Sequence, residues 1–279
     1  MLKLSKSKHN KIKEKKIRKM QTDEKITALG VGKKGCQIVE NMLEKIDGVK
    51  FADMCFQEDN VLTLFNAPLK FNIENNDDCK KIINENFNDA EIFFVIGDSF
   101  LVLSVAKAAK EAGKFIIGIT TASNEELRAE FKQISDALIS FNEVISSDEQ
   151  IKLSQNVVES IADLLTKSGF VNLEIEDIKA ILQNTGTAFL VTGTAEGENR
   201  AKTAALQAIG MCSKLKNAKR ILLNVTTGSE ISLSEIANVA EILEENASPD
   251  AMVIWGHIID KNIKGSMKIT FIAGMDDNI

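Results

Sequence analysis

The chain has 279 residues, of which 44% are hydrophobic and 27% charged, and its formal net charge is −6. That length is enough for two packed domains or one large one, and the composition is that of an ordinary globular protein. No apolar run approaches the roughly 18 residues that cross a bilayer, and no apolar stretch follows the basic N-terminus as in a secretory signal. We therefore expect a cytoplasmic protein rather than a membrane or secreted one.

Residue types that bind metals are few and scattered. No two cysteines form a C-x-x-C pair, and neither histidine has other ligand types beside it in the sequence. This spacing indicates reduced thiols and no metal site, disulfide framework or catalytic triad. The residues concerned are Cys36, Cys55, Cys79, Cys212, His9 and His257.

Charge is distributed unevenly along the chain. Residues 1–20 carry nine Lys or Arg against Glu14 alone, so this segment is near +8 while residues 21–279 are near −14. The acidic body argues against a specific nucleic-acid-binding domain. The basic segment could bind an anionic membrane, nucleic acid or an acidic partner, and the alternative is a solvated, disordered arm.

The first half alternates apolar runs with amphipathic stretches, which predicts a mostly parallel sheet with helical crossovers. The strands expected are Lys25–Leu29, Val49–Phe56, Ile92–Ile96, Phe115–Ile119 and Ala137–Phe141. The helices expected are one after Gly35 that carries Ile38 to Ile46, and Asp77–Asn86, Leu101–Ala112 and Glu125–Ile134.

A long helix is expected next, over Ser147–Ser168, with a serine cap, an acidic first turn and a stop at Gly169. Beyond it the pattern changes, and the last two apolar runs are expected to form an antiparallel pair around a Lys261–Gly265 turn. The elements expected here are helices Glu176–Leu182, Asn199–Ile209 and Leu233–Glu245, and strands Arg220–Thr226, Ala251–Ile259 and Ser266–Ala273.

The first strand leads into Gly30-x-Gly32-x-x-Gly35, a spacing that satisfies the dinucleotide-binding fingerprint. Asp53, near the end of the second strand, could then contact a ribose hydroxyl. Such a match is weak by itself, and the alternative is a glycine turn kept only for its backbone geometry.

Most of residues 25–275 resembles FtsZ, the bacterial relative of tubulin. The similarity is closest in Gly169–Asp177, in Gly193–Ala201 and in Ile221–Gly228, and it continues in Ser232–Glu241 and Pro249–Asp260. The resemblance implies an α/β, FtsZ/tubulin-like fold with a Rossmann-like parallel-sheet domain, a central long helix and a smaller α+β C-terminal domain. The expected division is a basic, disordered tail at 1–24, the nucleotide-type domain at 25–146, the central helix at 147–169 and the C-terminal domain at 170–279.

The parts that contact GTP in FtsZ proteins are altered here. Where the family has a run of glycines and an asparagine, this chain has Gly32-Lys33-Lys34-Gly35-Cys36-Gln37. The second strand ends in Cys55-Phe56-Gln57-Glu58 in place of Asn-Thr-Asp-Ala. The main phosphate loop is replaced by the shorter Gly97–Ser104, in which Asp98 would repel a triphosphate.

Two further departures concern the guanine and the phosphates. The Asn-Asp pair that reads guanine in the family is replaced by Ile151-Lys152, and a third glycine-rich loop is missing around Asn66–Asn76. Lys33 or Lys34 could still hold phosphate by charge, the alternative being two surface lysines.

One active element of the family is partly kept. The Asn-x-Asp-x-x-Asp loop, which the resemblance places in the next subunit's GTP site, reads here as Asn172, Glu174 and Asp177. The alternative is that these residues only begin a helix, since acidic residues favour helix N-termini. The family's C-terminal linker and anchor-binding peptide are not seen, so any membrane contact is expected from the tail.

We therefore expect an FtsZ-like protein of cell division or filament regulation that neither binds nor hydrolyses GTP. Its expected partners are FtsZ-like subunits or copies of itself, with capping of FtsZ filaments as one mode, and no cofactor is expected. The remnant loop (Asn172, Glu174, Asp177) and the remnant glycine turn (Gly30, Gly32, Gly35) are its candidate sites. Two alternatives stay open: an FtsZ-type GTPase with a remodelled GTP pocket that forms its own filaments, and a nicotinamide-dependent enzyme.

Overall fold

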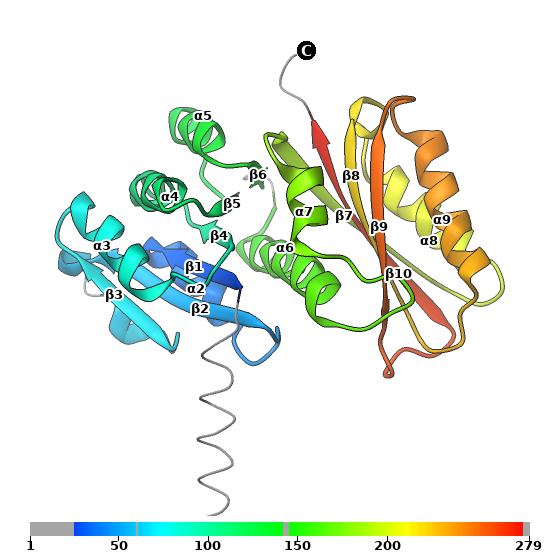
Figure 1. The fold of residues 1–279 in the computed structure, drawn as a ribbon, viewed down its shortest axis with the longest axis horizontal. Helices are drawn as coiled ribbons and strands as arrows, with labels where there is room; N and C mark the ends of the chain where they lie inside the picture. The colour runs from blue at the N-terminus through cyan, green and yellow to red at the C-terminus, as the bar shows by residue number, and fades with distance from the viewer. Residues whose placement is uncertain (1–24, 60, 142–144, 276–279) are drawn as a thin grey trace, which may run out of the picture.

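All strands of the part that the structure describes join in one ten-stranded sheet (Figure 1). The computed structural model describes residues 25–59, 61–141 and 145–275. The sheet order is β3-β2-β1-β4-β5-β6-β7-β10-β8-β9, and every neighbouring pair is parallel except the two that β10 makes. The strands are β1 (Ile26–Val31), β2 (Val49–Phe56), β3 (Leu69–Ile73), β4 (Ile92–Ile96), β5 (Phe115–Thr120), β6 (Ala137–Ser140), β7 (Gly186–Glu196), β8 (Arg220–Thr227), β9 (Met252–Ile259) and β10 (Ser266–Met275).

Helices cover both faces of this sheet, as Figure 1 shows. One face packs against α2, α6 and α7 in a single apolar core, while the other packs against α3, α4 and α5 in the first half and against α8 and α9 in the second. The helices are α2 (Gly32–Glu40), α3 (Asn76–Asn86), α4 (Leu101–Glu111), α5 (Glu125–Ile134), α6 (Ser147–Thr166), α7 (Ile175–Leu182), α8 (Arg200–Gly210) and α9 (Leu233–Asn246), with short 3₁₀ turns at Gln57–Asp59, Leu62–Leu64 and Leu215–Asn217.

The long helix α6 connects the two halves of the sheet. Its buried residues share one core with β1 and β2 of the first half and with Leu222, Ile258 and Ile272 of the second. Its N-terminus is capped by the Ser146 side chain, which accepts a hydrogen bond from the Glu149 N–H. The sheet itself continues from β6 to β7 without a break, so the division into domains stays a prediction.

The α/β fold, the parallel first half and the long helix are confirmed. The expected antiparallel pair of the last two strands is wrong. β10 lies between β7 and β8, antiparallel to both, and β9 pairs parallel with β8 at the edge of the sheet. Between β7 and β8, β10 has hydrogen-bond partners on both sides and is buried on both faces of the sheet. A strand at the end of a hairpin would have a partner on one side only.

Two strands were not expected from the sequence. β7 spans eleven residues, in which small and polar residues flank the short apolar run Phe189-Leu190-Val191, and β3 is a short edge strand within the 66–76 stretch. The basic tail at 1–24 lies outside the described residues. Within the described part, no helix has the length and apolarity needed to cross a bilayer.

Candidate functional site

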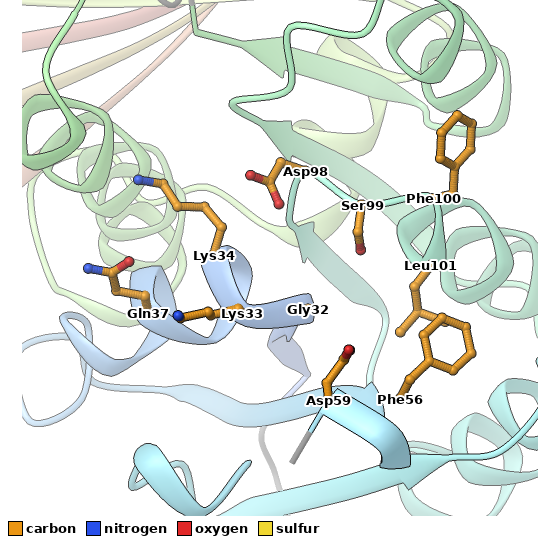
Figure 2. A pocket seen from close by; sticks show the side chains of 10 residues that line it. All are labelled: Gly32, Lys33, Lys34, Gln37, Phe56, Asp59, Asp98, Ser99, Phe100 and Leu101. Carbon is orange, nitrogen blue, oxygen red and sulfur yellow. The ribbon is translucent and has the colours of Figure 1, made fainter. Parts of the chain in front are cut away.

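A pocket of about 530 Å³ opens where β1, β2 and β4 end (Figure 2). Parallel strands carry their ligand sites at this carboxyl edge, so this is the position that the fold offers for a nucleotide. Figure 2 shows Phe56 and Leu101 together on the wall opposite Lys33 and Lys34. The pocket is lined by Gly32, Lys33, Lys34, Gln37, Phe56, Asp59, Asp98, Ser99, Phe100 and Leu101.

The three glycines of the fingerprint lie in the strand, turn and helix as expected, and packing explains them. A Cβ on Gly35 would lie 2.0 Å from the Ile96 carbonyl oxygen, and one on Gly30 would lie 2.8 Å from the Gly35 carbonyl oxygen. Gly32 has a φ of +70°, which disfavours any side chain. Glycines here allow α2 to begin close against β1 and β4, with or without a ligand.

Asp53, expected at a ribose in the dinucleotide interpretation, does not line the pocket. Its side chain is fully buried on β2 beneath Gly30, and neither carboxylate oxygen has a hydrogen-bond partner among the described residues. Burial raises its pKa to about 7, partly opposed by the nearby Cys36 thiol. A contact with a sugar in the pocket would require β2 to move, so the structure disfavours the nicotinamide interpretation.

The charges of the pocket nearly cancel. Lys33 and Lys34 face Asp59 and Asp98 across it, and the Lys34 ammonium donates a hydrogen bond to the Ser147 hydroxyl at the start of α6. Burial raises the pKa of Asp98, although the charge of Lys34 opposes the shift. A triphosphate would therefore meet two carboxylates as well as two ammonium groups.

The N-terminus of α4, where the fold would offer backbone N–H groups to a phosphate, is covered differently. Phe100 is its N-cap, with no side-chain hydrogen bond, and this residue is 54% exposed at the pocket rim. Ser99 Oγ is buried against Gly32 and has no hydrogen-bond partner in the described part of the chain. This loop therefore presents two apolar side chains, Phe100 and Leu101, and the Asp98 carboxylate to the pocket.

The remnant loop lies at the opposite edge of the sheet. Glu174 lines a second cavity, of about 420 Å³, together with Lys25 and Gly48, which precede β1 and β2. Within one molecule this loop cannot contribute to the pocket at the carboxyl edge. Only a second subunit could bring the two together.

The polar side chains of the loop make local hydrogen bonds. The Asn172 Oδ1 atom accepts from the Gly169 N–H at 3.0 Å, and the Asp177 Oδ2 atom accepts from the Glu174 N–H at 2.8 Å, at the first turn of α7. These contacts agree with the helix-start interpretation, and they leave the Glu174 side chain exposed.

His257, which the sequence gave no reason to select, holds the segment before this loop. Its Nδ1 atom accepts a hydrogen bond from the Phe170 N–H at 3.2 Å, so Nε2 carries the ring proton and donates to Thr227 Oγ1 at 2.8 Å. The Phe170 ring stacks on the imidazole with centroids 5.2 Å apart. The backbone of Val171 also pairs with that of His257, so the segment lies along β9.

The sequence blocks that carry the FtsZ resemblance have structural roles. Gly193 lets α8 approach β7, since a Cβ there would lie 2.1 Å from the Ala204 carbonyl oxygen. The buried Arg200 pairs with Glu235 at 3.0 Å and so joins α8 to α9. Packing is thus enough to account for Gly193, Arg200 and Glu235, without a ligand in the pocket.

No group of three or more His, Cys, Asp or Glu side chains in the described ranges is arranged to hold a metal ion. All four cysteines are free thiols, but two of them, Cys36 and Cys55, touch each other in the interior. Nothing in their sequence spacing indicated this contact.

Comparison with known proteins agrees with this geometry. Residues 186–276 match the FtsZ family, C-terminal domain. An FtsZ mutant from M. jannaschii superposes with a TM-score of 0.77 at 21% identity, covering 95% of both chains. An FtsZ dimer from M. jannaschii, described as empty, gives 0.77 and 21% over 96% of this chain and 92% of that one.

CetZ from Methanosaeta thermophila is similar with a TM-score of 0.65 at 15% identity, over 90% of this chain and 86% of that one. At these identities the likeness shows the fold. Residues 186–276 thus match an FtsZ-family C-terminal domain, and the chain as a whole has the FtsZ/tubulin fold.

Proposed function

We propose that this chain is an FtsZ-like cytoskeletal protein that neither binds nor hydrolyses GTP and acts through contacts with FtsZ-like subunits. The observation that supports this most is the pocket at the carboxyl edge. Its lining combines Asp59, Asp98, Phe56 and Phe100 with only two cationic side chains. Preorganised backbone donors supply most of the affinity for phosphate, and the carboxylates of Asp59 and Asp98 would oppose its charge.

The contact that we propose is head-to-tail, with one edge of this chain against the opposite edge of an FtsZ subunit. In FtsZ-type assembly the lower edge of one subunit, with its acidic loop, meets the GTP edge of the next. In this chain the edge that carries the remnant loop has an exposed Glu174, and the opposite edge carries the altered pocket. It would dock on an intact FtsZ subunit at one end of a filament and block the next addition.

The test is to add the full chain, at a small fraction of the subunit concentration, to a cognate FtsZ with GTP. Capping predicts shorter filaments and slower GTP turnover, because one capping molecule per end is enough. Glu174→Lys should abolish the effect by reversing a charge in the docking loop. Glu244→Lys, a matched reversal on the exposed side of α9, should leave it unchanged.

Unchanged filament length with the native chain would remove the capping proposal, as would equal effects of the two charge reversals.

A second candidate is a GTPase with a remodelled pocket, and the size of the pocket together with Lys33 and Lys34 favours it. Titration of labelled GTP and of NAD separates these functions: saturable GTP binding supports the second candidate, and NAD binding supports an enzyme.

A further inference from the structure

Two cysteines of different elements are in contact under the pocket. Cys36 Sγ, on α2, lies 3.3 Å from Cys55 Sγ, on β2, and both side chains are fully buried. The other two cysteines, Cys79 and Cys212, are buried free thiols in other core clusters.

The surroundings of the pair make the two thiols unequal. The contact with Cys55 and burial raise the pKa of Cys36, while the hydrogen bond from Cys36 lowers the pKa of Cys55. Cys36 Sγ also lies 3.6 Å from the Gly30 carbonyl oxygen, to which its thiol can donate. Cys55 has the greater thiolate character and is the better nucleophile.

We propose that Cys36 and Cys55 are a redox modification site, at which a peroxide converts the two thiols to a reversible intramolecular disulfide. The Cys55 sulfur attacks one peroxide oxygen, the O–O bond breaks, and with the thiol proton one water leaves, giving a sulfenic acid. The Cys36 sulfur then attacks the Cys55 sulfur, the S–S bond forms, and the S–O bond breaks to release a second water. Two thiols lose two electrons and two protons, and hydrogen peroxide is reduced to two waters.

Access to the pair depends on a thin cover. The thiols pack under Val61, Leu62 and the partly buried Phe65, in a small cluster separate from the main cores. Hydrogen peroxide is close to water in size, so a local opening of this cover is enough to admit it.

The disulfide would change the pocket because both of its walls are attached to the pair. Gly32, Lys33 and Lys34 precede Cys36 in the same helix, and Phe56 directly follows Cys55. The sulfur atoms must close from 3.3 Å to about 2.05 Å. The bond therefore draws α2 against β2 and fixes the two walls relative to each other, whether or not GTP binds there.

The test begins with the reduced full chain, treated with a small excess of hydrogen peroxide, quenched, denatured and labelled with N-ethylmaleimide. The labels on its four cysteines should fall to two, and peptide mapping should show Cys36 joined to Cys55. A dithiol should restore all four labels. The Cys79→Ser/Cys212→Ser double variant should fall from two labels to none at the same rate.

Four labels after treatment would overturn the proposal, as would a disulfide that involves Cys79 or Cys212 or a link between chains that disappears on dilution. Cys36→Ser should leave Cys55 without a cross-link. Because that substitution could unfold the chain, the double variant, which keeps the pair, decides the outcome.

Hydrogen exchange provides the second readout. Backbone amides of residues 32–37 and 54–59 should exchange several-fold more slowly in the oxidised form than in the reduced form, and those of α9 should not change. Equal exchange of the pocket amides in the two forms would show that the bond does not couple to the pocket.

Discussion

Asp53 is a carboxyl group that the fold keeps from water without giving it a hydrogen-bond partner among the described residues. Burial raises its pKa from 3.8 to about 7, so near neutral pH it holds a proton that the unfolded chain would have released. Stability is therefore greatest at acid pH for this group, and it falls as the pH rises towards 7.

Asp53→Asn should remove this dependence. Above pH 7 the variant should be more stable than the native chain, by up to ~4 kcal/mol at ~1.4 kcal/mol per pKa unit. At pH 3 and below, under the unfolded pKa of 3.8, the carboxyl is mostly protonated in both states and the two proteins should differ little. Urea unfolding at pH 3 and at pH 8 measures both differences, and a variant less stable at pH 8 would show that the charged carboxylate is stabilised in the fold.

The sequence predicted the backbone turn at the pocket but not which side chains meet there. The glycine spacing correctly located the turn between β1 and α2, because a positive φ and close packing leave only glycine. It could not show that Asp53 lies below the turn rather than in the pocket. The Cys36–Cys55 contact joins a helix to a strand nineteen positions away, and no local pattern encodes it.

Elements with complete local signals were predicted almost to the residue. β2, β4 and α5 have the expected bounds, since each is a continuous apolar run or a capped amphipathic stretch. The pairing of β9 and β10 failed because a turn signal gives adjacency in sequence, whereas β10 finds partners on both sides in the sheet. β7 was missed because small and polar residues interrupt its apolar run, among them Gly193, against which α8 packs closely.

The segment 168–172 should be sensitive to acid through His257. Burial lowers the pKa of this imidazole below its usual value of 6.5, so the ring is neutral in the fold and accepts the Phe170 N–H. The unfolded chain takes up a proton first as the pH falls below about 6.5, and stability is lost from there downwards. Protonation of Nδ1 would also turn the acceptor into a donor and break this contact.

Hydrogen exchange of the 168–172 amides, corrected for the intrinsic effect of pH, should show protection at pH 7.5 that is lost at pH 5.5. His257→Gln, which removes the titrating group, should exchange with little dependence on pH over this range. Protection that is equal at both pH values in the native chain would contradict the role given to His257.

At the scale of the whole molecule, the basic charge of residues 1–20 predicts binding to anionic membranes, which the acidic remainder of the chain would not favour. Residues 1–20 are near +8, and a basic residue close to an anionic membrane contributes ~1 kcal/mol. The full chain should sediment with anionic vesicles at low salt and be released at high salt. A variant that begins at residue 21 should stay in solution, and equal sedimentation of the two proteins would remove the tail from any membrane role.

We propose that the molecule keeps the sheet, central helix and C-terminal domain of the FtsZ fold and that its pocket does not bind GTP. Isothermal calorimetry of the full reduced chain with Mg²⁺ and GTP tests this claim most directly. We predict no saturable heat of binding at GTP concentrations in the micromolar range, with the same result for GDP. A dissociation constant for GTP in the micromolar range or below would show that the pocket still binds the nucleotide.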